Sequence, residues 1–385
     1  DRGVLAKVDG IIDLERTVNG GREPATPAKE PDGGPPSRGG RERAPTVSPL
    51  LSLQARLRSL HPFPHELAAL LYVVAGGLIL ELLPVTYPRK AVVMAAWWPA
   101  KWIAAIGIAA VAARRGAEWW RDRHRPPEER PRSTVGVDLL VLLRAAVILV
   151  PVLSVHFLLK SFIHLVNPRT WDVALWKVDQ AACFGLSPSL LLTGLFASPW
   201  FLQLLDLVYS RLYFFLIVLS VPLLLVLPTL PRRMAFLSAY TSVWITGSVV
   251  YLALPSWGPV FVVSQVFEEA LRHMPATVGV QSVLFEELSS LVRDPLGPRL
   301  VQFGCVAAFP SLHLAVVTVF AAASRWTSRR WFVGNALAVL VMLIGSVVTG
   351  YHYLVDGWAG ILLGIAACWL GRRLFPDAAE ERSGT

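Results

Sequence analysis

Two short polar runs interrupt the apolar carboxy-terminal part of the chain. One is Phe309-Pro310-Ser311-Leu312-His313, and the other extends from Gly350 to Asp356 and reads GYHYLVD. His352 and Asp356 are four positions apart, so on a helical backbone the carboxylate could accept the Nδ1 proton of the imidazole. The Nε2 atom of His352 would then be available as a nucleophile.

His313 is the candidate for the second role that such a nucleophile requires. Transfer of a phosphoryl group to His352 needs a group that protonates the departing oxygen, and an imidazole suits this role. Pro310 should pre-set the first turn of the helix that carries His313. The amide groups beside Ser311, at the positive end of the helix dipole, could then hold a phosphate oxygen. Each histidine, taken alone, could instead be an ordinary interfacial anchor.

No metal or other cofactor is predicted for this chemistry. The scheme needs none, and the chain has only three cysteines, Cys183, Cys305 and Cys368, which show no metal-ligand spacing. Cys183 and Cys305 both fall on the predicted outer side of the membrane. A disulfide between them is one hypothesis, and two unpaired buried thiols are the alternative.

The composition predicts that a lipid bilayer is the solvent. Of the 385 residues, 54% are hydrophobic and only 16% are charged. A spanning helix needs about 20 mostly apolar residues. The sequence therefore predicts an all-α, polytopic bundle of about eight transmembrane helices, at 67–85, 93–113, 137–159, 207–229, 234–254, 309–324, 332–352 and 354–370. The net charge of +9 is dispersed among loops and a tail, so no nucleic-acid partner is expected.

The apolar runs also divide the chain into parts. Residues 160–206 contain several Trp and Lys residues and are expected to be interfacial or re-entrant, while 256–308 should form a polar loop. The expected organisation is a disordered cytoplasmic tail with a possible interfacial helix (1–65), two additional transmembrane helices with a basic cytoplasmic loop (66–136), a six-helix catalytic core (137–370) and a cytoplasmic tail (371–385).

The distribution of arginine predicts the orientation. Cytoplasmic loops of membrane proteins retain an excess of Lys and Arg. With a cytoplasmic amino terminus, the arginine-rich connections at 114–132, 232–233, 325–330 and 372–382 all fall on the cytoplasmic side. We therefore expect an integral protein of the cell membrane with both termini cytoplasmic and the histidines facing the extracytoplasmic side.

The two polar runs resemble the motifs of a known family. The Pro-Ser-x-His run ending at His313 and the His-Tyr-x-x-Asp run beginning at His352 resemble the type-2 phosphatidic acid phosphatase superfamily. Within it, the chain is similar to the branch of inositol phosphorylceramide and sphingomyelin synthases, the inositol phosphotransferase branch. The resemblance implies a six-helix core in which His352 attacks phosphorus, Asp356 orients it, and His313 serves as general acid and then base. Two further segments resemble that branch more weakly, namely DQAACFGLSP (179–188) and YLALPSWGP (251–259).

The chain departs from the hydrolytic members of that superfamily at one position. Those members carry a Lys/Arg-rich first motif and an arginine after a serine ahead of the nucleophile. Here the residue six positions before His352 is Ser346, preceded by Gly345. Because the phosphate-clamping arginine is missing, simple phosphatase activity is not favoured.

Another cation must then bind the phosphate. Arg211, near the outer end of the fourth predicted helix, is the candidate, although it could instead snorkel from an aromatic belt with Tyr209 and Tyr213. Weaker candidates are Lys160, His164 and Lys177.

The sequence therefore predicts a metal-independent membrane enzyme. Its expected partners are a phospholipid or lipid-phosphate donor and a hydroxyl acceptor or water. The first hypothesis is a phosphotransferase that moves a phosphorylated head group to a hydroxyl acceptor through a phosphohistidine. The alternatives are a lipid phosphate phosphatase and a non-catalytic lipid transporter or scaffold.

Overall fold

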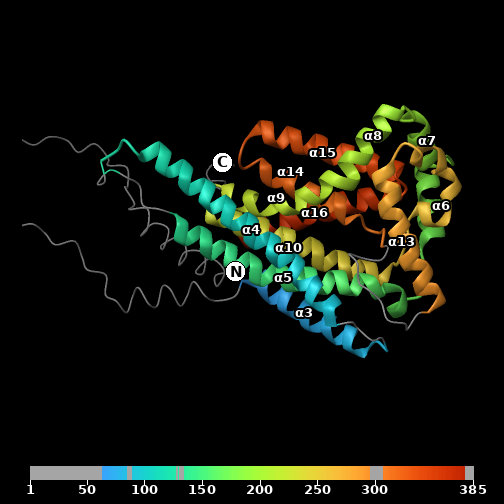
Figure 1. Ribbon diagram of the computed structural model, residues 1–385, viewed down its shortest axis with the longest axis horizontal. Coiled ribbons are helices and arrows are strands. Elements are labelled where there is room, and N and C mark those ends of the chain that lie inside the picture. The colour runs from blue at the N-terminus through green and yellow to red at the C-terminus, as the bar shows by residue number, and fades with distance from the viewer. Residues whose placement is uncertain (1–62, 85–88, 127–128, 130–133, 295–306, 378–385) are drawn as a thin grey trace, which may run out of the picture.

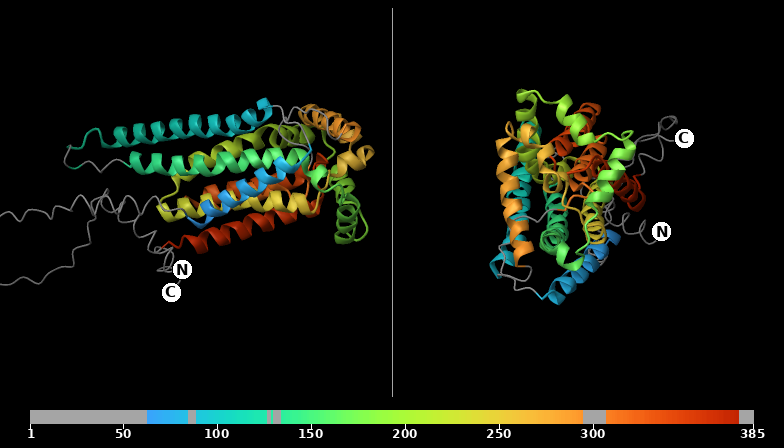
Figure 2. Two further views of the ribbon diagram at one scale, coloured as in Figure 1. Left: turned by 90° about the horizontal axis from the view of Figure 1, so that it is seen from below. Right: turned by 90° about the vertical axis from the view of Figure 1, so that its right-hand side faces the viewer.

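The computed structural model describes residues 63–84, 89–126, 129, 134–294 and 307–377, with the side chains of 89–92, 211–219 and 291–292 left aside. These residues form helices and turns and contain no strand, which confirms the all-α prediction. Long helices run side by side, and short helices lie across one end of them, here called the capped end (Figures 1 and 2). The possible interfacial helix of the amino-terminal tail, predicted over residues 48–60, lies outside the described residues.

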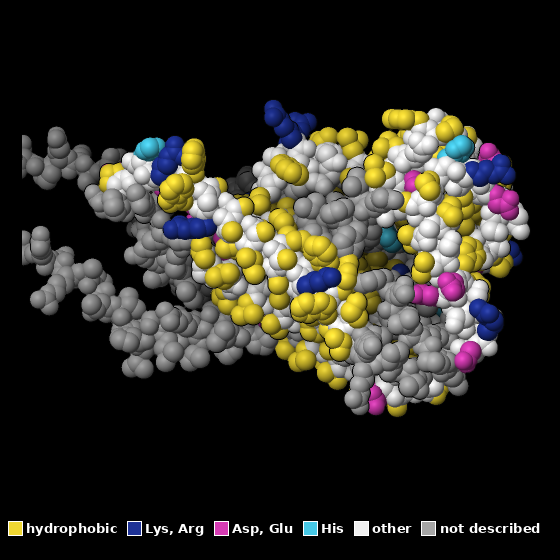
Figure 3. Space-filling model, viewed as in Figure 1, with side chains coloured by type: hydrophobic (Ala, Val, Ile, Leu, Met, Phe, Trp, Pro, Cys, Tyr) yellow, Lys and Arg dark blue, Asp and Glu magenta, His cyan; other side chains and the backbone are white. Residues whose placement is uncertain are grey.

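Each predicted apolar run corresponds to one long helix. These are α3 (Pro64–Leu82), α4 (Arg89–Asp122), α5 (Val135–Val166), α9 (Tyr213–Val226), α10 (Leu230–Ala253), α14 (Leu312–Ser324), α15 (Arg329–Val348) and α16 (Leu354–Leu374). Six of them, all except α9 and α14, are long and apolar enough to cross a membrane by themselves. Hydrophobic side chains cover most of the visible length of the bundle, as a lipid-facing surface requires (Figure 3).

The short helices at the capped end are α6 (Asp172–Ala182), α7 (Pro188–Leu195), α8 (Pro199–Leu207) and α13 (Pro275–Arg293). The apolar pair formed by α7 and residues 199–210 is bent by 115°, the geometry of a broken span or a re-entrant loop. The re-entrant loop is one of the two arrangements predicted for 160–206, and the choice between it and a broken span stays a prediction; residues 160–166 are instead the last turns of α5.

The prediction of a polar loop over 256–308 was wrong in part, because this stretch contains α11 (Pro259–Val262), a 3₁₀ turn at Ser264–Val266, α12 (Glu268–Leu271) and α13. In α13, Thr277 and Gln281 are buried and Leu284 and Leu288 are half-buried, so the inward positions follow helical spacing. Exposed apolar side chains elsewhere on this helix, such as Val280, Val283 and Phe285, obscured that pattern.

Glycines on α16 allow neighbouring backbones to approach it closely. A Cβ atom at Gly360 would clash with the carbonyl of Ser311, and one at Gly371 would clash with the carbonyl of Ala235 on α10. Small residues serve this purpose where membrane helices pack tightly. Here the close approach lets the Ser311 N–H donate to the Asp356 carbonyl at 3.0 Å. The starts of α14 and α16 are thereby fixed against each other.

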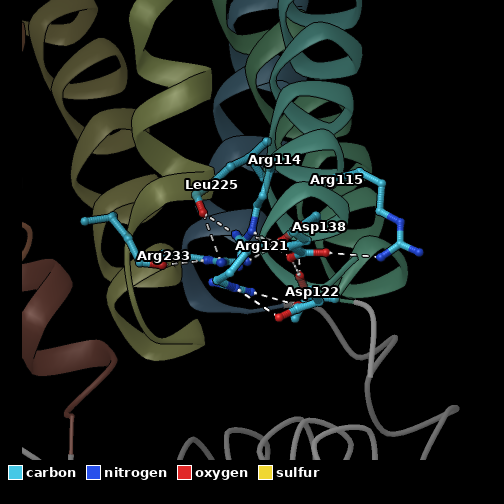
Figure 4. Close-up of polar contacts among 10 residues, drawn as sticks. Arg114, Arg115, Arg121, Asp122, Asp138, Leu225 and Arg233 are labelled. Atoms are coloured by element: carbon cyan, nitrogen blue, oxygen red, sulfur yellow. Dashed lines mark hydrogen bonds and ion pairs between the residues drawn. The ribbon is translucent and has the colours of Figure 1, made fainter. Parts of the chain in front are cut away.

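The opposite end of the bundle, here called the arginine end, is held by a buried carboxylate (Figure 4). Asp138 on α5 is 1% exposed and accepts hydrogen bonds from Arg233 at 2.7 Å and Arg114 at 3.3 Å. Both guanidinium groups also donate to the Leu225 carbonyl, and Arg233 to that of Leu227. Because a buried charge is tolerated when it is paired and hydrogen-bonded, this cluster can tie α4, α5, α9 and α10 together.

The first and last described helices also meet at the arginine end. The rings of Phe63, which precedes α3, and Phe375, which follows α16, pack edge to face with their centroids 5.1 Å apart. In addition, α3 is joined to α5 by an ion pair between Glu66 and Arg144 at 2.7 Å. The described chain thus starts and finishes on one side of the bundle, while the side of the membrane to which that end belongs stays a prediction.

Candidate active site

His352 lies at the capped end, in the turn between α15 and α16. Its side chain is 3% exposed, and its Nδ1 atom is 2.9 Å from the carbonyl oxygen of Ala308. Because a carbonyl oxygen can only accept, this contact assigns the proton of a neutral imidazole to Nδ1. The Nε2 atom then carries the lone pair that a nucleophile needs.

Asp356 does not lie, as the sequence had predicted, on the same helical turn as His352. His352 and Asp356 do not share a helical turn, because α16 begins at Leu354 and its N-cap Tyr353 has an extended backbone. The Asp356 carboxylate accepts the Tyr353 N–H at 2.8 Å, as the N3 residue of a capping box does, and lies 3.5 Å from Nδ1 of His352. The nearer partner of His352 is therefore the Ala308 carbonyl, which no sequence pattern indicated.

The structure brings His313 and His352 together, as predicted. His313 is the second residue of α14, and its Nδ1 atom lies 3.4 Å from Nε2 of His352. The Tyr209 ring stacks on His313 at 5.3 Å and on Tyr351 at 5.6 Å. Tyr209 belongs to a π-helical turn, Val208–Leu212, a local irregularity that is frequent at functional sites.

Ser311 is the N-cap of α14. Its hydroxyl accepts the Leu314 N–H at 3.4 Å, and its amide donates to Asp356. The helix begins at Leu312, so Pro310 precedes the cap and does not form the first turn, contrary to expectation. Because its own polar groups are engaged within the protein, Ser311 has a clear role in positioning His313, whereas its contact with phosphate stays a prediction.

Arg211 lies in the π-helical turn, two residues after Tyr209. Its side chain is outside the described ones, so its predicted role as a phosphate ligand stays a prediction. The hypothesis of a disulfide between Cys183 and Cys305 also stays a prediction, because Cys305 is outside the described residues.

Two buried carboxylates on α6 hold the segments on either side of the histidines, and the sequence did not single out either of them as a site residue. Asp179 accepts the N–H groups of Leu354 and Val355 at 2.7 and 2.8 Å and so caps α16. Burial raises the pKa of Asp179, while these two amides act in the opposite direction. The only signal for this carboxylate was its place at the start of DQAACFGLSP.

Asp172 links the segment at Trp257 and Gly258 to Tyr353, the residue that follows His352. Its carboxylate accepts the N–H groups of Trp257 and Gly258 and the hydroxyl of Tyr353, all within 3.1 Å. The neighbouring Ser256 carbonyl accepts the N–H of Ala308, whose own carbonyl holds Nδ1 of His352. The YLALPSWGP segment therefore supports His352 through backbone contacts.

A third buried carboxylate, Asp206, holds α13 against the same end of the bundle. It accepts the N–H groups of Ala276 and Thr277 at 3.0 and 2.7 Å. From α13, Gln281 donates to the Thr349 carbonyl at 2.7 Å, three residues before His352. Thus α6 and α13 both fix the turn that carries His352.

The last turns of α5 border the site as well. The Nζ atom of Lys160 lies 5.9 Å from the centre of the Tyr251 ring, and the Tyr251 hydroxyl is hydrogen-bonded to the N–H of Leu312. Burial, and then the charge of Lys160, lowers the pKa of His352 to about 3. The imidazole of His352 is therefore neutral at physiological pH.

The arrangement can transfer a group to nitrogen and supply a proton beside it. Within the described ranges, no group of three or more His, Cys, Asp or Glu side chains is placed to hold a metal ion. Metal-independent catalysis stays a prediction.

Fold and site together define a polytopic, helical membrane protein with a buried histidine pair at one end. A family model described as the PAP2 superfamily matches residues 173–370, just over half of the chain, and the chain therefore belongs to that superfamily. No curated protein and no solved structure matches the chain. The match runs from α6 to α16, and members of the superfamily are typically phosphatases or phosphotransferases, which supports an enzyme acting on lipid phosphates.

Proposed function

We propose that the protein is a lipid phosphotransferase that works through a phosphohistidine at His352. One observation carries the proposal: Nε2 of His352 lies 3.4 Å from Nδ1 of His313, while Nδ1 of His352 is held by the Ala308 carbonyl. This geometry supports a neutral nucleophile with an acid beside it.

In the first half of the reaction, the lone pair on Nε2 of His352 attacks phosphorus, and a P–N bond forms. The bond between phosphorus and the oxygen of the lipid alcohol breaks, and His313, which must enter this step as the imidazolium, gives one proton to that oxygen and becomes neutral. The positive imidazole that results at His352 is stabilised by the Ala308 carbonyl and by the carboxylate of Asp356, 3.5 Å from Nδ1.

In the second half, the acceptor hydroxyl gives its proton to His313, and its oxygen attacks phosphorus. The P–N bond breaks, and the electron pair returns to Nε2 of His352. With an alcohol as acceptor the product is a new phosphoester, and with water it is the phosphorylated head group or free phosphate. Phosphotransferase and phosphatase therefore differ only in the second nucleophile.

The transferase is preferred because of Ser346. This residue is fully buried on α15, and its carbonyl accepts the N–H of His352 at 3.1 Å. It occupies the position where the hydrolytic members carry arginine, and the transferase branch is expected to lack that arginine too. The inositol phosphotransferase branch is proposed on this ground and on the two weaker motifs, 179–188 and 251–259.

The site is proposed to face the extracytoplasmic side of the cell membrane. Helix α10 begins at the arginine end, near Arg233, and Tyr251 in its last turn borders the site. Because arginine-rich connections stay in the cytoplasm, the capped end would lie outside and both termini inside.

The test is to incubate the purified full chain with radiolabelled phospholipids and lipid phosphates, with and without polyol and ceramide-like acceptors. A new labelled lipid that forms only with an acceptor is expected. Label on the protein that survives alkali and is lost in acid would identify the phosphohistidine. Free phosphate alone would favour the phosphatase. No product and no labelled protein with any donor would favour the transporter or scaffold.

A further inference from the structure

An aromatic stack lies beside the histidine pair. The centre of the Tyr209 ring is 5.3 Å from that of His313 and 5.6 Å from that of Tyr351. The interplanar angles are 29° and 26°, so both contacts are nearly parallel stacks and not edge contacts. Tyr209 is 4% exposed, so the face that it turns to the imidazole of His313 is shielded from water.

The position of the Tyr209 ring is fixed by α13 and α15 as well as by its own π-helical turn. Asp206, before Tyr209, accepts the N–H of Thr277 at 2.7 Å, and Ser210, after it, is hydrogen-bonded to the Thr277 hydroxyl at 2.7 Å. On α15, Gly345 leaves the space that the ring fills, since a Cβ atom there would lie 3.3 Å from Cδ2 of Tyr209. The ring is thus held against His313 from two neighbouring helices.

His313 must carry a positive charge when it acts as the acid, and burial of an imidazolium is unfavourable. The charged and titratable groups around it in the described part of the chain include Lys160 from α5, Tyr251 from α10, His352 from the turn before α16, Asp356 from the first turn of α16 and Tyr209 from the π-helical turn.

These groups do not act on the imidazolium in the same way. The positive charge of Lys160 acts on His313 and opposes a second cation. The carboxylate of Asp356 is engaged by the N–H of Tyr353 and lies against His352. The π face of an aromatic ring, in contrast, attracts a cation within about 6 Å of its centre, most strongly where water is excluded. The ring of Tyr209 meets both conditions.

We propose that Tyr209 is a positioning residue whose ring holds His313 opposite His352 and stabilises, by a cation–π interaction, the imidazolium that delivers the proton to the departing oxygen. This inference rests on the proposed function, because it takes His313 as the acid of that reaction. The ring acts through His313 and needs no contact with the substrate.

The test measures the titration midpoint of His313 by NMR in the detergent-solubilised full chain, with histidine labelled in the imidazole ring. His313→Asn assigns the signal. Tyr209→Leu removes the ring, and Tyr209→Phe retains it. Phenylalanine with two or three ring fluorines, incorporated at position 209, keeps the shape of the ring but withdraws electron density from its face. The matched control places the same fluorinated residue at position 201, because Phe201 is also stacked, on Phe196 at 4.6 Å.

The cation–π interaction predicts a His313 midpoint roughly 0.5 to 1.5 pH units lower in Tyr209→Leu than in wild type. Tyr209→Phe should stay within a few tenths of a unit of wild type, each added fluorine should lower the midpoint further, and the control at position 201 should change nothing. Equal midpoints in Tyr209→Phe and its fluorinated forms would overturn the proposal. So would a wild-type His313 that stays neutral down to pH 4.5. If Tyr209→Leu fails to fold, the fluorinated series supplies the result.

A kinetic measurement separates this role from a purely structural one. The rate at which a radiolabelled phospholipid donor labels the protein should fall as His313 loses its proton. In Tyr209→Leu this fall should begin at lower pH by the same shift, so that the rate at pH 7.5 is roughly 3- to 30-fold lower, with little change in KM. A loss by one constant factor at every pH would mean that the ring only supports the fold, and would overturn the proposal.

Failure of the proposed function would look different. Wild-type protein that never forms a phosphoenzyme, but whose His313 midpoint still depends on the ring at position 209, would refute the transfer chemistry and leave the cation–π interaction in place. A phosphoenzyme that forms while the midpoint is insensitive to that ring would refute the role of Tyr209 alone.

Discussion

The low pKa of His352 predicts a specific loss of stability in acid. Burial, and then the charge of Lys160, lowers this pKa to about 3 from an ordinary value of 6.5. Between these two values the unfolded chain binds a proton that the folded protein does not. Stability is therefore lost as the pH falls below 6.5. From pH 7.5 to pH 4.5, this single imidazole should lower the free energy of unfolding by about 2.6 kcal/mol.

The comparison variant is His352→Asn, which has no proton to bind at this position. The free energy of unfolding of both proteins is measured by denaturant titration in the same detergent at pH 7.5 and pH 4.5. Contributions from histidines distant from the pair, such as His65 and His156, are common to both proteins and cancel, whereas His313 contacts His352 at 3.4 Å, so the comparison is repeated in a His313→Asn background. From pH 7.5 to pH 4.5, the free energy of unfolding of the variant should fall by about 2.6 kcal/mol less than that of wild type.

A difference between the two proteins below about 1 kcal/mol would mean that the His352 imidazole titrates almost as it does in the unfolded chain. That result would refute the inference that burial keeps the nucleophile neutral, and with it the assignment of the proton to Nδ1 alone. Equal acid sensitivity of the two proteins at every pH would have the same meaning.

Further changes test the rest of the site and the fold. His313→Ala should reduce turnover about as much as His352→Ala, with no further loss in the double variant, since acid and nucleophile act as one unit; additive losses measured in turnover assays would contradict this. Turnover should persist in excess EDTA, and complete loss would indicate a metal enzyme. Asp179→Ala should lower both kcat and the free energy of unfolding, the latter by about 2–4 kcal/mol, because two buried N–H groups lose their acceptor; unchanged values would exclude this role. Asp138→Ala should lower the free energy of unfolding by about 3–5 kcal/mol, because Arg233 keeps a buried, uncompensated charge; thermal or denaturant unfolding measures it, and a loss under 1 kcal/mol would mean that the cluster is hydrated.

The long helices were predictable because a bilayer imposes a simple rule on the sequence. Every run of about 20 apolar residues must satisfy its own backbone, and helices do so locally. The eight predicted runs therefore all correspond to helices, although α14 has only 13 residues. The helical nature of α13 was missed because this helix has no such continuous apolar run.

The reactive pair was predictable for a different reason. Histidine and aspartate in apolar surroundings are conspicuous, and His313 and His352 do face each other. The partners of these side chains were not predictable. His352 is held by the backbone carbonyl of Ala308, and a backbone contact of this kind cannot be inferred from the residue type. The position of Asp356 relative to His352 depends on α16 beginning only after its N-cap, Tyr353.

The supporting carboxylates on α6 illustrate a more general limit. Asp179 caps residues that are 175 and 176 positions further along the chain. A single sequence gives the identity of both partners but not their pairing. The family resemblance drew attention to the segment that begins with Asp179, but its role as a cap became clear only from the folded arrangement.

This long-range pairing has a consequence for biosynthesis. Asp172 and Asp179 are both on α6, but their partners at Tyr353, Leu354 and Val355 belong to the last helix and the turn before it. During synthesis the two carboxylates therefore precede their partners by more than 170 residues. The candidate site is complete only when α16 is in place, so a chain that stops before α16 cannot assemble it.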